Sequence, residues 1–172
     1  MQLEEVVKDK TKKAKEKVGI VGKWLLERTL RTDELLAFAE SAKDSDKATC
    51  IEALEFATKL DAGIADESVL EFVTNSLGDK APRVKWESAK VIGNIAVNFP
   101  KQLDVPIRNL LVNANYDGTV VRWAAAYALG EILKLKTDYN KELLRTIESL
   151  ASAENENGVK KKYLDALKKL KK

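Results

Sequence analysis

Hydrophobic and polar positions along this chain follow the spacing of amphipathic helices, arranged in pairs that short polar turns separate. In residues 66–77, apolar side chains recur at helical spacing directly after Asp66, a residue type that caps helix N-termini. Pro82 and Pro106 fit the first turn of a helix, where the missing N–H costs nothing. The first helices of these pairs are expected at residues 33–42, 67–77, 105–114 and 141–153.

The second helix of each pair repeats one pattern. The stretch VKWESAKVIGNIA begins at Val84, and VRWAAAYALGEIL begins 37 residues later at Val121. Two weaker copies flank them: ATCIEALEFATKL from Ala48, which puts Phe56 in the column of Ile92, and VKKKYLDALKKLKK from Val159. Self-similarity at a period of 20–50 residues is typical of a solenoid, whose end repeats need a polar outer face.

The pattern predicts an all-α fold. We expect an α-solenoid, a right-handed superhelix of about four helix pairs, whose units span about 32–61, 66–99, 103–136 and 139–172. A helix over about Val21–Arg31 is expected to cap the first repeat, which places the repeat domain at 18–172. Residues 1–17 are interpreted as a basic charged arm, either disordered or a solvated helical extension.

The repeat resembles the HEAT-repeat family. The residues that carry the resemblance are NYDGTVVRWAAAYALGEI (115–132) and, with substitutions, GDKAPRVKWESAKVIGNI (78–95). The first unit has Thr49 where the family's basic residue is expected, and the last has Lys168 where its glycine is expected. The resemblance implies that Asp117 and Arg122 link adjacent turns, although a solvated charge pair explains the same residues. It also implies close approach of helices at Gly93 and Gly130.

Charge is distributed unevenly along the chain. The net charge is +3, but residues 1–31 contribute +4 and residues 155–172 contribute +5, so the middle carries −6. A surface that follows a phosphate backbone is expected to be basic along its whole length, so this distribution disfavours nucleic acid as the main ligand. No apolar run reaches the length of a membrane span, and the N-terminus lacks the apolar core of a secretory signal. We therefore expect a cytoplasmic protein.

The sequence offers little material for catalysis. Histidine is absent, which removes the usual general base and the commonest metal ligand. Cys50 is the one cysteine and falls in an apolar helical column, so we interpret it as a packed thiol. No phosphate-binding loop, nucleophile elbow or metal-ligand spacing occurs. We therefore predict no catalytic residues, no metal and no cofactor.

Two tryptophans suggest a binding surface instead. With 100° per residue, Trp86 and Trp123 lie opposite the main apolar face of their helices, one repeat apart. In HEAT-like arrays that side of the second helix faces the concave groove. The predicted concave stripe is Trp86, Lys90, Asn94, Trp123, Tyr127 and Glu131. Alternatively, both rings wedge between neighbouring second helices and serve stacking alone.

The leading hypothesis is a non-catalytic scaffold that binds a protein or peptide on its concave face. One alternative is a DNA-binding enzyme of the HEAT-like alkylation-repair type, which the acidic middle disfavours. A second is a HEAT-like subunit of a bilin lyase. Mixed or acidic charge on the concave face would favour a protein partner, and positive charge along its whole length would favour DNA.

Overall fold

The structure, a computed structural model, describes residues 2–171 and is all-helical over that range. The first helices of the four pairs are α3 (Thr32–Ser41), α5 (Glu67–Ser76), α7 (Asp104–Asn113) and α9 (Asn140–Ala153). The second helices are α4 (Asp44–Leu60), α6 (Pro82–Ile95), α8 (Thr119–Lys134) and α10 (Asn157–Leu170). Helices α1 (Gln2–Lys8) and α2 (Ala14–Leu26) precede them, and two short 3-10 helices, η1 (Ala62–Ile64) and η2 (Ala96–Asn98), follow α4 and α6. The predicted all-α solenoid is confirmed.

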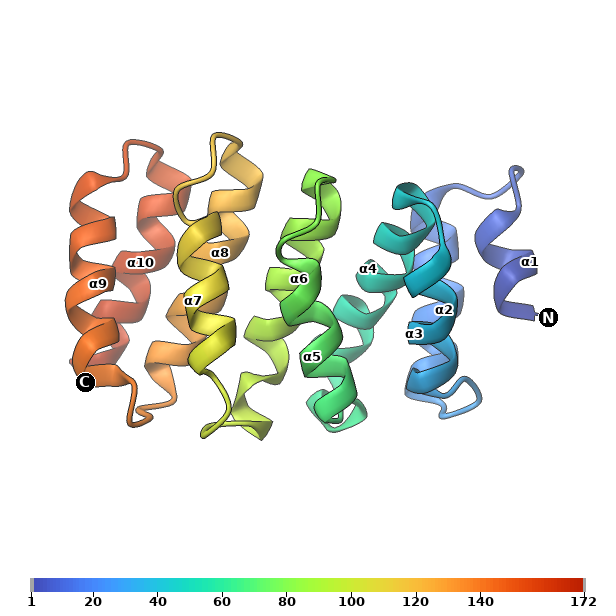
Figure 1. Ribbon diagram of the computed structural model, residues 1–172, viewed down its shortest axis with the longest axis horizontal. Coiled ribbons are helices and arrows are strands. Elements are labelled where there is room, and N and C mark those ends of the chain that lie inside the picture. The colour runs from blue at the N-terminus through green and yellow to red at the C-terminus, as the bar shows by residue number, and fades with distance from the viewer. Residues whose placement is uncertain (1, 172) are drawn as a thin grey trace.

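The helices form two layers (Figure 1). Helices α2, α4, α6, α8 and α10 pack side by side in one layer, while α3, α5 and α7 contact their neighbours in the other more sparsely. In a curved solenoid the tightly spaced layer is the inner one, so the second helices lie on the concave side. We call the side of α4, α6, α8 and α10 that faces away from the first helices the second-helix face.

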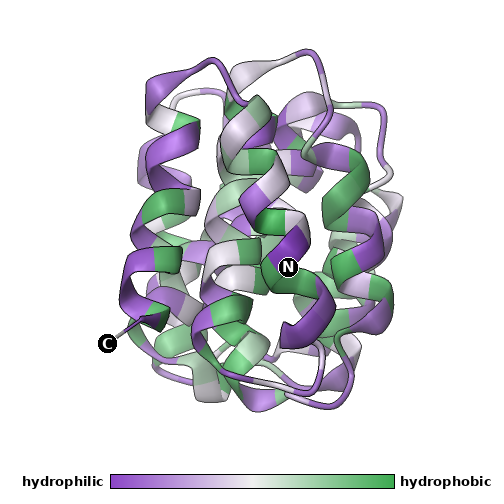
Figure 2. Cartoon of the chain, turned by 90° about the vertical axis from the view of Figure 1, so that its left-hand side faces the viewer, coloured by the Kyte–Doolittle hydropathy of each residue, from purple (hydrophilic) through white to green (hydrophobic). Residues whose placement is uncertain are grey.

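The core runs continuously between the two layers. The end-on view in Figure 2 shows hydrophilic residues mainly on the outer sides of the helices and hydrophobic residues toward the middle. The α6 positions predicted to face the core, among them Val84, Val91 and Ile95, are fully buried. Asp66 caps α5 by accepting a 3.0 Å hydrogen bond from the N–H of Val69, and Pro82 begins α6, as predicted. None of the helices within residues 2–171 is long and apolar enough to cross a membrane.

The N-terminal end differs from the sequence-based expectation. The capping helix is α2, which ends at Leu26, whereas a helix over 21–31 was expected. Arg28 adopts φ 62°, and the N–H of Thr29 reaches back 3.0 Å to the carbonyl of Trp24, so a left-handed residue ends the helix there. Residues 2–8 form α1, which buries Leu3 and Val7 against the core and is therefore more than a solvated arm.

The repeat register predicted for the first unit is wrong by two residues. Phe56 is 40% exposed, whereas Ile92, its predicted equivalent, is completely buried, and it is Leu54 that matches Ile92 in burial. Lys47, rather than Thr49, occupies the basic column, and its ammonium lies 3.1 Å from Oδ2 of Asp79 in the turn before α6. The sequence of α4 can be aligned with that of α6 in the predicted register or two residues away from it, because small and large apolar residues alternate in α4. It also has no glycine to align with Gly93, so the sequence alone does not decide between the two alignments.

Arg122 makes the equivalent link in the C-terminal half. Its guanidinium donates two hydrogen bonds, of 3.1 and 3.2 Å, to the carboxylate of Glu154 in the turn before α10. It also donates to the backbone carbonyls of Tyr116 and Asp117, at 3.0 and 2.8 Å. Arg122 therefore links adjacent turns, as the resemblance implies, but it contacts the backbone carbonyl of Asp117 rather than its carboxylate.

The two aligned glycines serve different contacts. A Cβ built at Gly130 would lie 3.1 Å from the Cβ of Ala166, so Gly130 does permit close packing of α8 on α10. A Cβ at Gly93 would lie 2.5 Å from Cε2 of Tyr127. Gly93 therefore makes room for an aromatic ring of the next helix rather than for its backbone.

Candidate functional site

All six residues of the predicted stripe lie on α6 and α8, and all six are half-buried. Trp86, Lys90 and Asn94 follow one another at helical spacing on α6. Trp123, Tyr127 and Glu131 do the same on α8. Among the six, side-chain contacts join Tyr127 to Asn94 and to Trp123.

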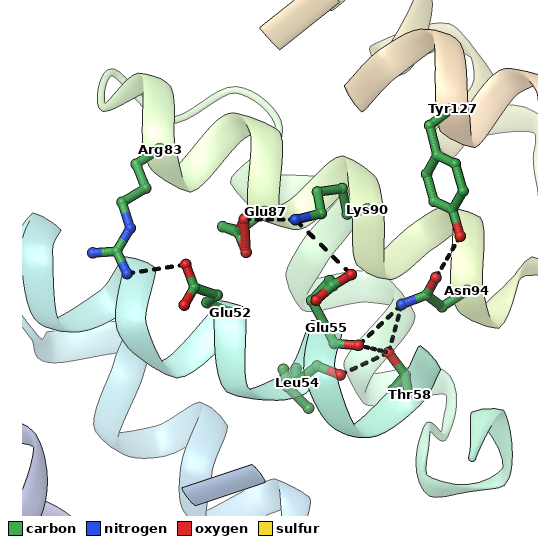
Figure 3. A network of polar contacts seen from close by, with 9 residues as sticks. All are labelled: Glu52, Leu54, Glu55, Thr58, Arg83, Glu87, Lys90, Asn94 and Tyr127. Carbon is green, nitrogen blue, oxygen red and sulfur yellow. Dashed lines mark hydrogen bonds and ion pairs between the residues drawn. The ribbon is translucent and has the colours of Figure 1, made fainter. Parts of the chain in front are cut away.

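Asn94 is the residue that ties three second helices together (Figure 3). The hydroxyl of Tyr127 on α8 donates a 2.6 Å hydrogen bond to Oδ1 of Asn94. Nδ2 of Asn94 in turn donates to the carbonyl of Glu55 at 3.1 Å and to Oγ1 of Thr58 at 3.2 Å, both on α4. Burial, and then the charges of Glu131 and Glu55, raise the pKa of Tyr127 to about 12, so the phenol stays protonated as a donor at neutral pH.

Carboxylates and cations alternate next to this link (Figure 3). Nζ of Lys90 lies 3.1 Å from Oε1 of Glu87 and 3.9 Å from Oε1 of Glu55. Arg83 pairs with Glu52 at 3.4 Å. The α4–α6 part of the second-helix face is therefore a network of three carboxylates and two cations.

Glu87 is the unusual member of that network, since it is only 2% exposed. Its Oε2 has no hydrogen-bond partner among residues 2–171. Burial raises the pKa of Glu87, the neighbouring Lys90 opposes that rise, and Glu52 and Glu55 add to it. A buried carboxylate with one free oxygen is costly, which makes this position sensitive to pH.

The aromatic residues lie on the α8 side of the face. The rings of Trp123 and Tyr127 stack with centroids 6.0 Å apart, and Nζ of Lys162 on α10 lies 5.0 Å from the centroid of Trp123. Trp86 and Trp123 both pack partly against the core while remaining half-buried. Glu131 forms an ion pair with Lys134 on its own helix. Both tryptophans therefore contact the core, and their role as anchors for a partner stays a prediction.

Sequence reasoning missed the α4 side of the network and the buried acid. Glu52, Glu55 and Thr58 lie three residues apart on α4, a spacing that places them on one face. The wrong register of the first unit hid this pattern. Glu87 was overlooked because a charged residue in a helix is usually solvated.

Cys50, the one cysteine of the sequence, is buried. Burial, with a smaller effect of Asp46, raises the pKa of the Cys50 thiol to about 12, which suppresses the thiolate that acts as nucleophile. No group of His, Cys, Asp and Glu within residues 2–171 is arranged to hold a metal ion.

No protein-family model and no curated protein matches this sequence. Solved structures do match the fold. The chain is similar to a chain of the complex of CpcE and CpcF of phycocyanin lyase from Nostoc sp. PCC7120, with a TM-score of 0.74 and 19% sequence identity. The match covers 96% of this chain and 97% of that one. The two chains share a fold. An engineered protein is also similar, with a TM-score of 0.59 and 15% identity over 99% of this chain and 97% of that chain.

Proposed function

We propose that this protein is a protein-binding subunit that engages a partner through its second-helix face, within the HEAT-like class of solenoids. The observation that carries the proposal is the composition of that face. Half-buried aromatic and polar side chains run across α4, α6 and α8, and hydrogen bonds between helices hold them in place. A rigid surface with aromatic anchors loses little conformational entropy on binding a protein.

The charge of the face supports a protein partner over DNA. On α4 and α6, Glu52, Glu55 and Glu87 stand against Arg83 and Lys90, so positive charge does not continue along the array. A DNA duplex bound along the second-helix face would bring its phosphates against these carboxylates. Mixed charge of this kind is usual in interfaces between proteins.

Two exposed valines allow a matched test of this proposal. Val97 is 55% exposed in η2, three residues after Asn94 of the predicted stripe, and Val112 is 71% exposed on α7 in the other layer. Affinity capture from the native cell is expected to recover a partner with the wild-type chain and with Val112→Arg. The same partner is expected to be lost with Val97→Arg. Equal capture by both variants would show that binding uses another surface.

A second candidate is a subunit of a bilin lyase-type complex, and the similarity to the phycocyanin lyase chain favours it. In this reading the chain acts together with a second chain, as CpcE and CpcF form a complex. Binding of an open-chain bilin would induce circular dichroism in the visible region, because a protein site imposes one twist on the chromophore. An absence of induced dichroism with the chain alone, and with its captured partner added, would reject this candidate.

A further inference from the structure

A groove of about 380 Å³ lies between α8 and α10. Gly130 and Ala166 line it at a close contact of the two helices, where a Cβ on Gly130 would lie 3.1 Å from the Cβ of Ala166. Tyr127 also lines the groove, together with charged side chains from both helices. The charged lining residues are Glu131, Lys134, Lys162, Asp165, Lys168 and Lys169.

The lysines exceed the acids in this lining, and two of the four lysines are already engaged. Lys134 pairs with Glu131, and Lys162 lies over the ring of Trp123. Lys168 and Lys169 are exposed, and their ammonium groups make no hydrogen bond or ion pair with other described residues. The groove therefore presents unneutralised positive charge beside an aromatic surface.

The neighbouring part of the face limits what can bind there. Glu52, Glu55 and Glu87 lie on the α4–α6 side, so a long polyanion that continued along the face would meet carboxylates. A short anionic segment confined to the groove would meet four lysines and two acids, and one of those acids, Glu131, is already paired with Lys134. We propose that the α8–α10 groove binds a short acidic segment of a partner protein. This inference rests on the proposed protein-binding function and adds the chemistry of the partner.

Binding of acetylated, amidated hexaglutamate, followed by ¹H–¹⁵N NMR, tests the inference. The peptide is expected to shift amides of α8 and α10 around Gly130 and Lys169 in a saturable way that weakens with added salt. Hexaglutamine is expected to cause no shifts. Absence of saturable shifts, shifts centred on another part of the chain, or tighter binding of a six-nucleotide oligothymidylate would overturn the inference.

Variants with the same net charge distinguish binding of hexaglutamate in the groove from its general electrostatic attraction to a basic helix. Lys168→Glu with Lys169→Glu is expected to weaken hexaglutamate binding about tenfold or more, and the milder Gln pair about threefold. Lys160→Glu with Lys161→Glu changes the net charge equally on the same helix outside the groove, and is expected to change binding about twofold or less. Equal weakening by both Glu pairs would reject a groove site.

The capture experiment distinguishes this inference from the proposal on which it rests. If a native partner is captured and Val97→Arg loses it, but hexaglutamate does not bind the groove, the acidic-segment inference fails and the protein-binding function stands. If the chain captures no partner at all, the proposed function fails as well.

Discussion

Glu87 and Lys90 form an ion pair in which the acid is buried and the base is not. Oε1 of Glu87 lies 3.1 Å from Nζ of Lys90, and the side chain of Glu87 is 2% exposed against 26% for Lys90. The free Oε2 of Glu87 faces no donor in the described part of the chain. The pair therefore couples protonation to stability on the same face that we assign to binding.

Replacing Glu87 with Gln is expected to alter the pH dependence of stability. Because the pKa of Glu87 is raised in the folded state above its ordinary value of 4.5, the folded state binds that proton more tightly than the unfolded state. The contribution of Glu87 thus favours folding at low pH and becomes less favourable as the pH rises from about 4.5 through the raised pKa. Urea unfolding across this range should show Glu87→Gln gaining stability relative to wild type with rising pH. A constant or shrinking difference would contradict the assignment.

Arg122 and Glu154 should show strong coupling in a double-mutant cycle. Their side chains are 18% and 9% exposed and share two hydrogen bonds, so we expect a coupling free energy of about 1–2 kcal/mol. Burial opposes ionisation of Glu154, but hydrogen bonds from Arg122 and from backbone N–H groups outweigh it and lower the pKa. The coupling should accordingly be present above about pH 4.5 and disappear as the pH falls through that lowered pKa. The exposed pair Arg108 with Asp104 serves as a control, with an expected coupling well below ~1 kcal/mol.

Two glycine-to-alanine substitutions should have opposite effects. Gly93→Ala places a Cβ 2.5 Å from the Tyr127 ring, so the ring must move and its hydrogen bond to Asn94 is strained. We expect a loss of about 1–3 kcal/mol in the free energy of unfolding. Gly19 lies within α2 with no atom within 4 Å of an added Cβ, so Gly19→Ala should stabilise by about 0.5–1 kcal/mol. Equal effects at both positions would show that the ring does not press on Gly93.

The first helix should contribute measurably to stability. Leu3 is 1% exposed in α1, and its truncation to Ala is expected to cost about 2–4 kcal/mol in a chemical denaturation experiment. Gln2→Ala, an exposed neighbour on the same helix, should change stability by less than about 0.5 kcal/mol. If Leu3→Ala matched wild type, α1 would be a solvated extension after all.

Repetition made the second helices predictable from the sequence. The matching columns of α6 and α8 located the core positions and the six stripe residues on the correct helices, because helical periodicity fixes which side chains share a face. The register of α4 was ambiguous because no glycine marks its column. The burial of α1 depends on long-range packing of Leu3 and Val7, and local charge gave no sign of it. The network around Glu87 requires α4 and α6 to pack side by side, a relationship that one sequence does not contain.

Site-specific photo-crosslinking in the native cell tests the central claim most directly. A benzoylphenylalanine introduced at Val97, in η2 directly after α6, should cross-link to a discrete protein partner, and the same group at Val112 on α7 should not. Comparable exposure of the two valines makes the positions fair controls for each other. Cross-links from Val97 alone are the predicted result. Cross-links from Val112 alone, or from neither position, would contradict the assignment of the second-helix face as the protein-binding surface.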